Sequence, residues 1–505
     1  MNHRLILCLA AVLAIGACND QQDPSTGQNP ADFAVTSGTE RINVLLKAPA
    51  TAANRTELAK HGAIYDEIAQ LNVVLMRVKG DEISAIKALP FVASVSMDAV
   101  RDVGPIPAIE AGVEDFVGGN NVWNMDAINV TDKLSGGRKV SQDGSGVYVA
   151  ILDTGLLPSW RSFFPEERIA DRYARTFGGG GAADVGATPT PDNKWEQDVN
   201  SHGTHVASIV LGYQYRSAAS GPLQIAGVAP KATVIPVKVL NQNGSGWSSS
   251  IAQGITYVAD LAADSLNGAR VVINMSLGGS QPSVVEKAAI DYALVRNVVV
   301  VAAAGNSGPD GAMGFPGGFP SVISVAAAGW IGEWNNPAAN CPAVSLPDAL
   351  TPSRFWRQCD VPDPYDQKNF YIADFSAEPK VVGGITQDLD VAAPGSWVVG
   401  PWQEQQGTIS YFFIGGTSQA SPHVAGIVAL LLQQNPGLAA ADVEPKLEAA
   451  AKDLAFSGQQ VRPGTGTAPF VLAPVPSWAT DGRSGHGFIT ADAALGTSTA
   501  SRPGR

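Results

Sequence analysis

Four polar residues of this 505-residue chain stand where a parallel α/β sheet binds its ligands. Asp153 and Asn306 each follow a continuous apolar run of the kind that forms a strand buried on both faces. His202 and Ser418 each open a segment that is suited to a buried helix. Because such sheets bind ligands at the carboxyl ends of their strands, these four side chains are candidates for a single site.

Each residue type indicates a particular chemistry. A serine at a helix N-terminus is a candidate nucleophile, because that end of a helix favours developing negative charge. A histidine at a helix start, beside a glycine, can act as a general base, and an asparagine amide can donate to an oxyanion. Taken singly, each residue also has a structural interpretation: Ser418 as a helix cap, Asp153 and Asn306 as turn residues.

A metal site is the other interpretation of the histidines. His202 and His205 are three residues apart, but the glutamate of a zinc-protease motif does not accompany them, and the chain has only six histidines. We therefore expect His205 to be a buried core histidine, and the sequence assigns no metal ligand.

An alternation of apolar runs and helix-length segments must position these residues. Apolar runs separated by helices predict a parallel sheet. The predicted strands are residues 147–152, 234–240, 271–275, 298–303 and 322–327, and the predicted helices are residues 250–263 and 284–295. The expected fold is a three-layer α/β/α arrangement with a mainly parallel central sheet.

The segment around Ser418 predicts a helix buried on all sides. Gly415 and Gly416 precede it and suggest a tight turn with positive φ, which glycine adopts without steric cost. Pro422 is expected near the first turn, where its missing N–H does least harm. From Val424 onward the helix is apolar on every side.

The motifs around the four residues resemble those of subtilisin-like serine proteases and occur in the same order. They are AILDTG at residues 150–155, HGTHVA at 202–207, AAGN at 303–306, GTS at 416–418 and HVAG at 423–426. The order Asp, His, Ser is that of subtilisin. The resemblance covers about residues 121–496.

This resemblance implies a role for each residue. Ser418 would be the nucleophile, His202 the general base, and Asp153 the carboxylate that orients the imidazole. Asn306 and the backbone N–H of Ser418 would form the oxyanion hole. No cofactor is required for such catalysis. Structural calcium is common in the family, but its ligands cannot be assigned from this sequence.

The resemblance also implies three segments that contact the substrate. Two of them would flank the peptide backbone as strands, and the third would line a roomy, apolar primary pocket with broad specificity. These residues are Ser276, Leu277 and Gly278; Gly244, Ser245 and Gly246; and Ala303, Ala304 and Gly305. Trp247 is expected either to restrict an outer pocket or to pack on the surface.

A small α+β domain precedes the catalytic domain. Apolar runs and helix-prone segments alternate as β-α-β-α-β over residues 40–100. This domain resembles the ferredoxin-like, inhibitor-type prosegment of secreted subtilisin-like proteases, which assists folding and occupies the binding cleft until it is cleaved. Residues 101–120 are expected to be a linker that contains the processing site, and the catalytic domain spans residues 121–496.

The first 39 residues predict export. A basic start and an apolar run too short to span a bilayer indicate a signal peptide over residues 1–17. The sequence before Cys18 resembles a bacterial lipobox, in which the cysteine is lipidated; ordinary secretory cleavage is the alternative. Residues 18–39 predict a flexible tether. The protein is therefore expected in the bacterial cell envelope or outside the cell, with contact to a membrane only through this anchor.

Other features of the sequence bear on partners and decoration. The net charge of −13 argues against nucleic acid as a partner. Cys341 and Cys359 could form a disulfide after export, or remain as two buried thiols. Residues 159–194 and 330–371 are irregular insertions of unassigned role, and residues 497–505 are expected to be a disordered tail.

Two hypotheses for the function follow. The first is an exported serine endopeptidase that cleaves polypeptides and is made as a precursor inhibited by its own propeptide. The second is a catalytically inactive peptide-binding protein on the same scaffold.

Overall fold

The computed structural model of the chain describes most of both predicted domains. The residues it describes are 38–104, 108–110, 122–132, 137–177, 192–217, 221–330, 370–403, 409–452, 459–463, 470–474 and 483–497. The signal peptide, Cys18, the tether up to residue 37, Cys341, Cys359 and the tail from residue 498 lie outside them. Within the described residues, no helix has both the length and the apolar character needed to cross a membrane.

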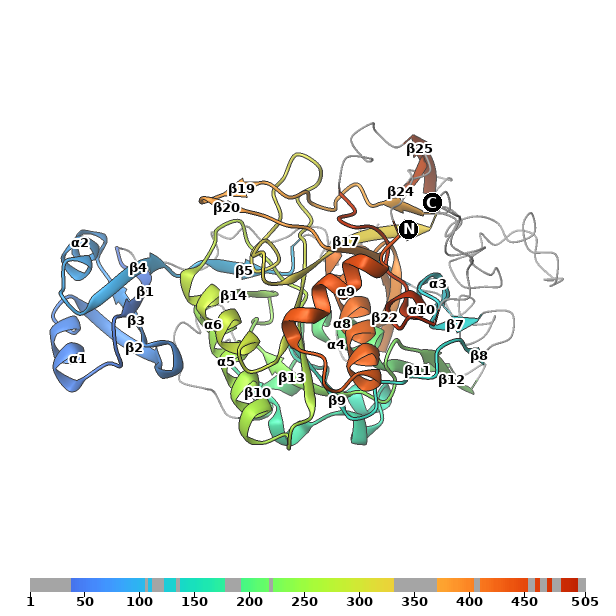
Figure 1. Ribbon diagram of the computed structural model, residues 1–505, viewed down its shortest axis with the longest axis horizontal. Coiled ribbons are helices and arrows are strands. Elements are labelled where there is room, and N and C mark those ends of the chain that lie inside the picture. The colour runs from blue at the N-terminus through green and yellow to red at the C-terminus, as the bar shows by residue number, and fades with distance from the viewer. Residues whose placement is uncertain are drawn as a thin grey trace, which may run out of the picture.

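The N-terminal domain is a four-stranded antiparallel sheet with two helices (Figure 1, blue). Its elements are β1 (Glu40–Leu46), α1 (Ala52–Leu58), β2 (Gly62–Ile68), β3 (Val73–Val78), α2 (Ile83–Lys87) and β4 (Val92–Met97). The strand order β2-β3-β1-β4 and the chain order β-α-β-β-α-β are ferredoxin-like. The sequence pattern predicted three strands and missed β2, whose pairing with β3 shifts register between Ile64 and Asp66. A bulge of this kind breaks the alternation that identifies a strand.

The second domain is built on a mainly parallel sheet, as the alternation predicted; the sheet has eight strands, of which β10, β18 and β21 were not among the five predicted. Six strands follow the order β10-β13-β9-β15-β16-β17 and pair in parallel; β21 also pairs in parallel with β17, and β18 pairs with it antiparallel. Their bounds are β9 (Val147–Asp153), β10 (Arg175–Thr176), β13 (Thr233–Lys238), β15 (Arg270–Met275), β16 (Val299–Ala303), β17 (Ile323–Trp330), β18 (Phe370–Ile372) and β21 (Val391–Pro394).

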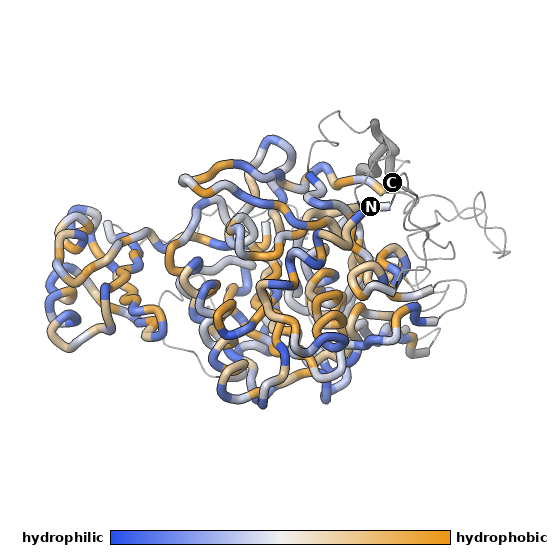
Figure 2. The backbone as a smooth tube through the Cα atoms, viewed as in Figure 1, coloured by the Kyte–Doolittle hydropathy of each residue, from blue (hydrophilic) through white to orange (hydrophobic). Residues whose placement is uncertain are grey.

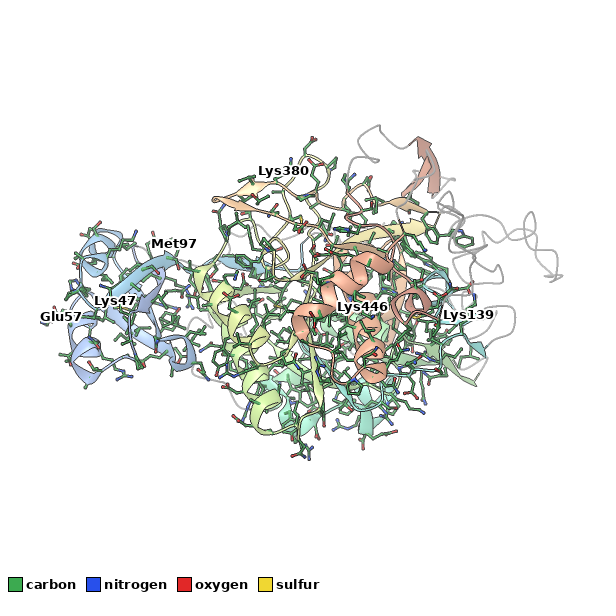
Figure 3. The ribbon with its side chains drawn as sticks, in the orientation of Figure 1. Lys47, Glu57, Met97, Lys139, Lys380 and Lys446 are labelled. Atoms are coloured by element: carbon green, nitrogen blue, oxygen red, sulfur yellow. The ribbon has the colours of Figure 1, made fainter. Side chains whose placement is uncertain are left out.

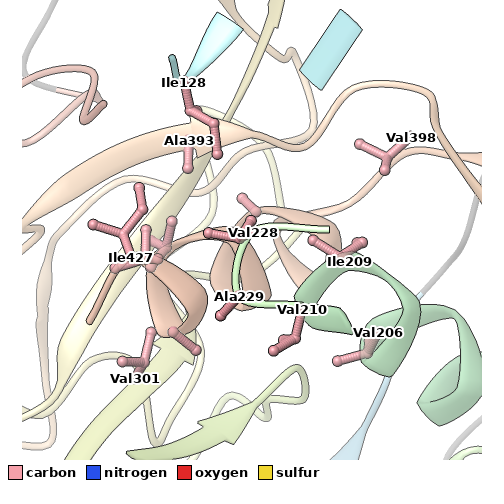
Figure 4. Packing of buried hydrophobic residues seen from close by; sticks show 14 of the residues in the cluster. Ile128, Val206, Ile209, Val210, Val228, Ala229, Val301, Ala393, Val398 and Ile427 are labelled. Atoms are coloured by element: carbon pink, nitrogen blue, oxygen red, sulfur yellow. The ribbon is translucent and has the colours of Figure 1, made fainter. Parts of the chain in front are cut away.

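Helices cover both faces of this sheet. The helices α4 (His202–Leu211) and α8 (Thr417–Gln434) pack on one face, and α5 (Ser248–Asp264) and α6 (Val284–Leu294) pack on the other. Strand β9 shows why its sequence is a continuous apolar run: Val149 and Ile151 join the α4 and α8 core, whereas Ala150 and Leu152 join the α5 and α6 core. Figure 4 shows Val206, Ile209 and Val210 of α4 in the same buried cluster as Ile427 of α8 and Val301 of β16. The three-layer prediction is confirmed.

Smaller elements complete the two domains. The helices are α3 (Trp123–Ala127), α9 (Val443–Ala450) and α10 (Ala491–Ala494). The paired strands are β5 (Val100–Asp102) with β14 (Ser245–Trp247), β6 (Ala108–Glu110) and β22 (Val398–Gln403) with β23 (Ile409–Ile414), β7 (Thr131–Asp132) with β8 (Gly137–Arg138), β11 (Gly212–Ser217) with β12 (Gly221–Ala226), β19 (Val381–Val382) with β20 (Ile385–Thr386), and β24 (Gln459–Pro463) with β25 (Phe470–Pro474). Hydrophobic residues concentrate along the central elements (Figure 2), while the charged side chains of Glu57, Lys139 and Lys380 lie at the periphery (Figure 3).

The N-terminal domain packs against α5 and α6 (Figure 1). One face of its sheet, including Val74 and Met76, packs on the domain's own helices. The other face contributes Val73 and Leu75 to the core that surrounds α5 and α6. Each buried side chain of this size stabilises the contact by about 1.5–3 kcal/mol, so the two domains form a substantial apolar interface.

Candidate active site

Asp153 and His202 form a buried hydrogen-bonded pair. Asp153 is the last residue of β9 and His202 the first of α4, and both side chains are fully buried. Nδ1 of His202 lies 2.8 Å from Oδ1 and 3.0 Å from Oδ2 of Asp153. Since an ionised carboxylate only accepts hydrogen bonds, Nδ1 carries the proton and Nε2 is left as the basic atom.

The start of α4 is fixed by a second buried carboxylate. Asp198 accepts hydrogen bonds from the backbone N–H of Ser201 (2.7 Å) and from the backbone N–H and hydroxyl of Thr204 (3.0 and 2.7 Å). These bonds satisfy donors that a helix start leaves free. Ser201 adopts φ 73°, an uncommon conformation for a residue other than glycine, so the turn that presents His202 is held in a strained form.

The same turn requires a glycine after the histidine. A methyl group at Gly203 would lie 2.4 Å from the carbonyl oxygen of Gly155, which follows β9. The backbone N–H of Gly203 donates to the Thr154 hydroxyl at 2.8 Å, so the two loops are in direct contact. Close approach at this point brings His202 to Asp153.

A buried lysine contacts the loop that directly follows Asp153. Lys238, at the end of β13, donates through Nζ to the carbonyl of Thr154. Burial lowers the pKa of Lys238, and the carboxylates of Asp198 and Asp153 oppose this shift. The lysine therefore offsets part of the negative charge that two buried carboxylates would place beside His202.

Ser418 lies in the first turn of α8, as predicted, and its neighbours hold it from two sides. Its hydroxyl donates to the carbonyl of Ser276 at 3.1 Å, and its own carbonyl accepts from the Ser276 hydroxyl at 2.8 Å. Pro422 lies in the second turn of α8, not the first, and has no N–H for the Ser418 carbonyl. The Ser276 hydroxyl replaces that missing donor, so Ser276 supports the helix rather than only bordering a substrate.

The glycine before α8 has a different role from the one predicted. Gly416 is extended, with φ 171°, so it does not form a turn with positive φ. A methyl group there would lie 2.7 Å from Oε1 of Gln419 and 3.5 Å from Nδ2 of Asn306. Gly416 is therefore required for space beside the asparagine amide.

Asn306 is oriented by the residue that precedes Ser418. Its Oδ1 accepts hydrogen bonds from the backbone N–H of Thr417 at 2.9 Å and from the Thr417 hydroxyl at 2.8 Å. The Thr417 hydroxyl also accepts from the N–H of Gly305 at 3.0 Å. Both Nδ2 of Asn306 and the backbone nitrogen of Ser418 lie near Gly416, at 3.5 and 3.6 Å from the position that a methyl group there would take.

These contacts place the four predicted residues in two groups: Asp153 with His202, and Asn306 with the turn that carries Ser418. Helix α4 packs against α8 on one face of the sheet, so His202 and Ser418 start neighbouring helices. Nε2 of His202 has no hydrogen-bond partner among the described residues, while the Ser418 hydroxyl points to Ser276. The hydrogen bond between a nucleophile and its base is often incomplete without a substrate. The arrangement has the parts needed for acyl transfer.

A strand from the N-terminal side passes beside these residues. In β5, Arg101 pairs with Gly246 of β14, and Asp102 pairs with Ser245 of β14 on one side and with Gly278 on the other. The N–H of Asp102 donates to the carbonyl of Gly278 at 2.9 Å, and Gly278 returns the same bond. This segment had been predicted as a linker; it is a strand held between the two edges that the resemblance assigned to substrate.

Beyond β5 the chain continues toward the side-chain amide of Asn306. The N–H of Val103 donates to the carbonyl of Gly244 at 3.1 Å. Two residues beyond Asp102, a methyl group at Gly104 would lie 3.4 Å from Nδ2 of Asn306. Residues 100–104 therefore run between the two segments that the resemblance assigned to the substrate backbone, and Gly104 lies near the side-chain amide of Asn306.

The other predicted residues are placed as follows. Leu277 is buried in the core around α5 and α6, while Ala303 and Ala304 are 3% and 0% exposed at the end of β16. Trp247 lies partly buried in β14, with the Arg41 guanidinium 4.6 Å from its ring, so it contacts the N-terminal domain.

His205 is the core histidine that the sequence indicated. Its side chain is fully buried, and its Nε2 lies 3.1 Å from the carbonyl of Val398. Burial lowers the pKa of His205 to about 3, and nearby His202 adds to the shift, so the ring is neutral.

One cluster of carboxylates could hold a metal ion. Ligand atoms of Asp390, Glu444 and Glu448 lie within 4.8 Å of one another. Burial, with added repulsion between neighbouring carboxylates, raises the pKa of Asp390 to about 8 and that of Glu444 to about 7. The pattern of the sequence did not reveal this cluster, because Asp390 precedes β21 and the two glutamates lie on α9.

The positioning residues were also missed from the sequence. Asp198 stands four residues before His202, and Thr417 directly precedes Ser418, so both were within reach of a search around the motifs. Lys238 could not be recognised from the sequence, because it lies far along the chain from Thr154 and the two meet only in the folded protein.

Comparison with known proteins identifies the family. The model of the subtilase family, Peptidase_S8, matches residues 144–466. Thermitase of Thermoactinomyces vulgaris is 32% identical over 316 residues, which cover 63% of this chain and 85% of that protein. Subtilisin DY of Bacillus licheniformis is 32% identical over 317 residues, covering 62% of this chain and 86% of that protein.

A solved structure shows the same fold. Fervidolysin from Fervidobacterium pennivorans, described as a keratinolytic enzyme related to subtilisin, aligns with a TM-score of 0.58 at 23% identity. The alignment covers 91% of this chain and 61% of fervidolysin. With the family model matching more than half of its length, the chain belongs to the subtilase family of serine endopeptidases.

Proposed function

We propose that the protein hydrolyses peptide bonds through Asp153, His202 and Ser418, with Asn306 as oxyanion donor. The observation that carries this proposal is the Asp153–His202 pair at the start of a helix that packs against the helix of Ser418. The Ser418 oxygen attacks the carbonyl carbon of the substrate while Nε2 of His202 takes the hydroxyl proton. Asp153 holds the imidazole and stabilises its charged form.

The intermediate then collapses. Its oxyanion accepts hydrogen bonds from Nδ2 of Asn306 and the N–H of Ser418. The C–N bond breaks, and the leaving amine receives the proton held by His202. Water then attacks the acyl-enzyme and gives a proton to His202. The bond between the acyl carbon and the Ser418 oxygen breaks, and His202 returns the proton to that oxygen as the acid departs.

A casein digest separates this proposal from that of an inactive peptide-binding protein. We expect the wild-type protein to degrade casein and both Ser418→Ala and His202→Ala to leave it intact. Equal degradation in all three preparations would rule out the proposed triad. If the wild-type protein leaves casein intact, the result would favour the hypothesis that the chain is a catalytically inactive peptide-binding protein.

We also propose that residues 40–100 are a propeptide that inhibits the enzyme. Support comes from the apolar interface with α5 and α6 and from β5, which pairs with the two segments assigned to the substrate backbone. Asp98 adds polar contacts: it accepts from the N–H and hydroxyl of Ser249, at 3.0 and 2.7 Å, at the start of α5. A carboxylate at this end of a helix is favourably placed.

The purified active enzyme is expected to begin between Arg101 and Asn121. Because the strand over residues 100–104 must leave before another peptide can pair with β14, a start after residue 104 within this range is favoured. Intact mass spectrometry measures this directly, and Ser418→Ala serves as the control, because a chain that cannot cleave itself should keep residue 40. An active preparation that retains residue 40 contradicts the proposal.

Structural calcium fits the carboxylate cluster. Oδ2 of Asp390 accepts from Ser324, whereas its Oδ1 is buried without a partner among the described residues. Carboxylate oxygens are the ligands that Ca²⁺ prefers, and water or carbonyl oxygens would complete the shell. Asp390, Glu444 and Glu448 would hold the ion and tie α9 to the start of β21.

Calcium should therefore raise the thermal stability of the protein. In the Ser418→Ala background, which prevents self-digestion, saturating Ca²⁺ is expected to raise Tm by about 2–5 °C. Glu444→Gln should lose most of this gain, while Glu378→Gln, outside the cluster, should keep it. If Ca²⁺ raised the Tm of Glu444→Gln and Glu378→Gln by the same amount, calcium would not bind at this cluster.

We further propose that the protein is exported and anchored by a lipid on Cys18. Its support is the sequence before this cysteine. Cys18→Ala should move the protein from the membrane fraction to the soluble fraction on cell fractionation. Unchanged fractionation would favour ordinary signal-peptide cleavage.

A further inference from the structure

A fully buried ion pair joins the strand of the N-terminal segment to the catalytic domain. Arg101 lies in β5 and Glu286 in the first turn of α6, and both side chains are 0% exposed. Nε of Arg101 lies 3.0 and 3.3 Å from the two oxygens of Glu286, and Nη2 lies 2.7 Å from Oε2. This is the fork geometry in which a guanidinium matches a carboxylate, which a lysine does not reproduce.

The rest of the pocket also fits a guanidinium. Nη2 of Arg101 donates to the carbonyl of Gln281 at 3.0 Å, and Nη1 donates to the carbonyl of Val100 at 2.9 Å. A methyl group at Gly279 would lie 2.8 Å from Nη1, so this glycine leaves the space that the group fills. Three parts of this pocket, Glu286, Gln281 and Gly279, belong to the catalytic domain.

The register of β5 relates the pocket around Glu286 to the proposed substrate site. Gly104 lies at the amide of Asn306, and Arg101 precedes it by three residues. A peptide bound in the same register would present its bond after the residue at Gly104 to Ser418. The pocket of Glu286 would then receive the fourth residue before that bond.

Glu286 needs a cation in this position. Burial raises the pKa of Glu286, and the charge and hydrogen bonds of Arg101 oppose this shift. A buried carboxylate that loses its partner is strongly unfavourable, because no water replaces the hydrogen bonds. Once residues 100–104 leave, another ligand must supply the cation, or water must enter the pocket and hydrate the carboxylate.

We propose that Glu286 makes this pocket a guanidinium-binding subsite, so that the enzyme prefers polypeptides with arginine four residues before the cleaved bond. The inference rests on the proposed protease function and adds a substrate class to it. The chain's own Arg101 is then the first ligand of the subsite, and the N-terminal segment and preferred substrates compete for the same contacts. A substrate with lysine at this position should bind the subsite less well, because an ammonium group cannot donate the two parallel N–H hydrogen bonds of a guanidinium.

The preference is measured with a matched set of peptide amides and the purified active enzyme. The peptides share alanine, valine and phenylalanine before the cleaved bond and differ only in the residue ahead of these three: arginine, lysine, glutamine or leucine. We expect kcat/KM for the arginine peptide to exceed that for the glutamine peptide by about 30-fold or more, as for a buried charge that gains its partner. Lysine should fall between them.

Variants assign the preference to Glu286. Because Glu286→Gln would leave Arg101 buried without a partner during folding, the main variant is the double exchange Arg101→Leu with Glu286→Leu. It should cleave the leucine peptide at least as well as the wild-type enzyme and lose its preference for arginine. Asp291→Asn, on the exposed side of the same helix, is the matched control and should keep the wild-type order.

The outcomes are distinct. Equal cleavage of all four peptides by the wild-type enzyme overturns the arginine preference and leaves the protease function intact. A preference for arginine that persists in the double exchange overturns the assignment to Glu286. If no peptide is cleaved, the proposed function fails and the substrate preference fails with it.

Discussion

Ser418→Ala and His202→Ala are each expected to lower kcat for a peptide amide by about a millionfold, and the double variant is expected to be no slower than either. The figure is the one known for the corresponding residues of a subtilisin. The physical reason is that serine and histidine act as one unit: without the base the hydroxyl keeps its proton, and without the hydroxyl the base has nothing to activate. Steady-state kinetics on the three purified variants measures both the loss and its non-additivity.

Contamination by host proteases is the main hazard of this experiment. A variant at a surface site, Lys380→Ala, purified in the same way, should keep wild-type kcat and so establish the recovery of active protein. Circular dichroism should show the same fold in all preparations. If the loss of kcat in the double variant equalled the product of the two single losses, Ser418 and His202 would act independently, contrary to the mechanism.

Asn306→Ala is expected to lower kcat by about 100- to 1000-fold and to leave KM within a few-fold of the wild-type value. This range is the one known for the side-chain oxyanion donor of a subtilisin. The loss should appear in kcat because the amide donates to the oxyanion, which exists only in the transition state and intermediate. Its two contacts with Thr417 orient Oδ1 and thereby aim Nδ2.

Asn306→Asp is the informative second variant. It keeps the size of the side chain and its acceptor oxygen for Thr417 but replaces the donor with a carboxylate. We expect kcat to fall at least as far as in Asn306→Ala, because a negative charge would face the oxyanion. A KM that rises while kcat is unchanged in either variant would show that Asn306 binds substrate in the ground state only.

Most of the candidate site was predictable because its signals are local. Asp153, His202 and Ser418 each sit in a short motif whose glycines are needed for close contact, as Gly203 shows against Gly155. The alternation of buried strands and helices likewise follows from nearby residues. Five strands of the central sheet (β9, β13, β15, β16 and β17) and the helices α5 and α6 were therefore predicted close to their observed bounds.

The remaining features depend on contacts between distant segments. Nothing near Ser276 indicates that its hydroxyl compensates for Pro422, or that Arg101 reaches Glu286 across 185 positions of sequence. Residues 101 and 102 of β5 were predicted to lie in a linker, because a single strand held by two edges of another domain needs no apolar alternation of its own. Strand β2 was missed because a bulge interrupts its pattern.

The most direct test of the central claim is the reaction of the active enzyme with a fluorophosphonate, followed by peptide mapping. A fluorophosphonate reacts with a serine only when a neighbouring base activates it, so it reports the triad without any substrate preference. The mechanism predicts one phosphonylated residue, Ser418, and loss of labelling in His202→Ala. An adduct on another serine, or labelling of Ser418 that does not depend on His202, would contradict the account.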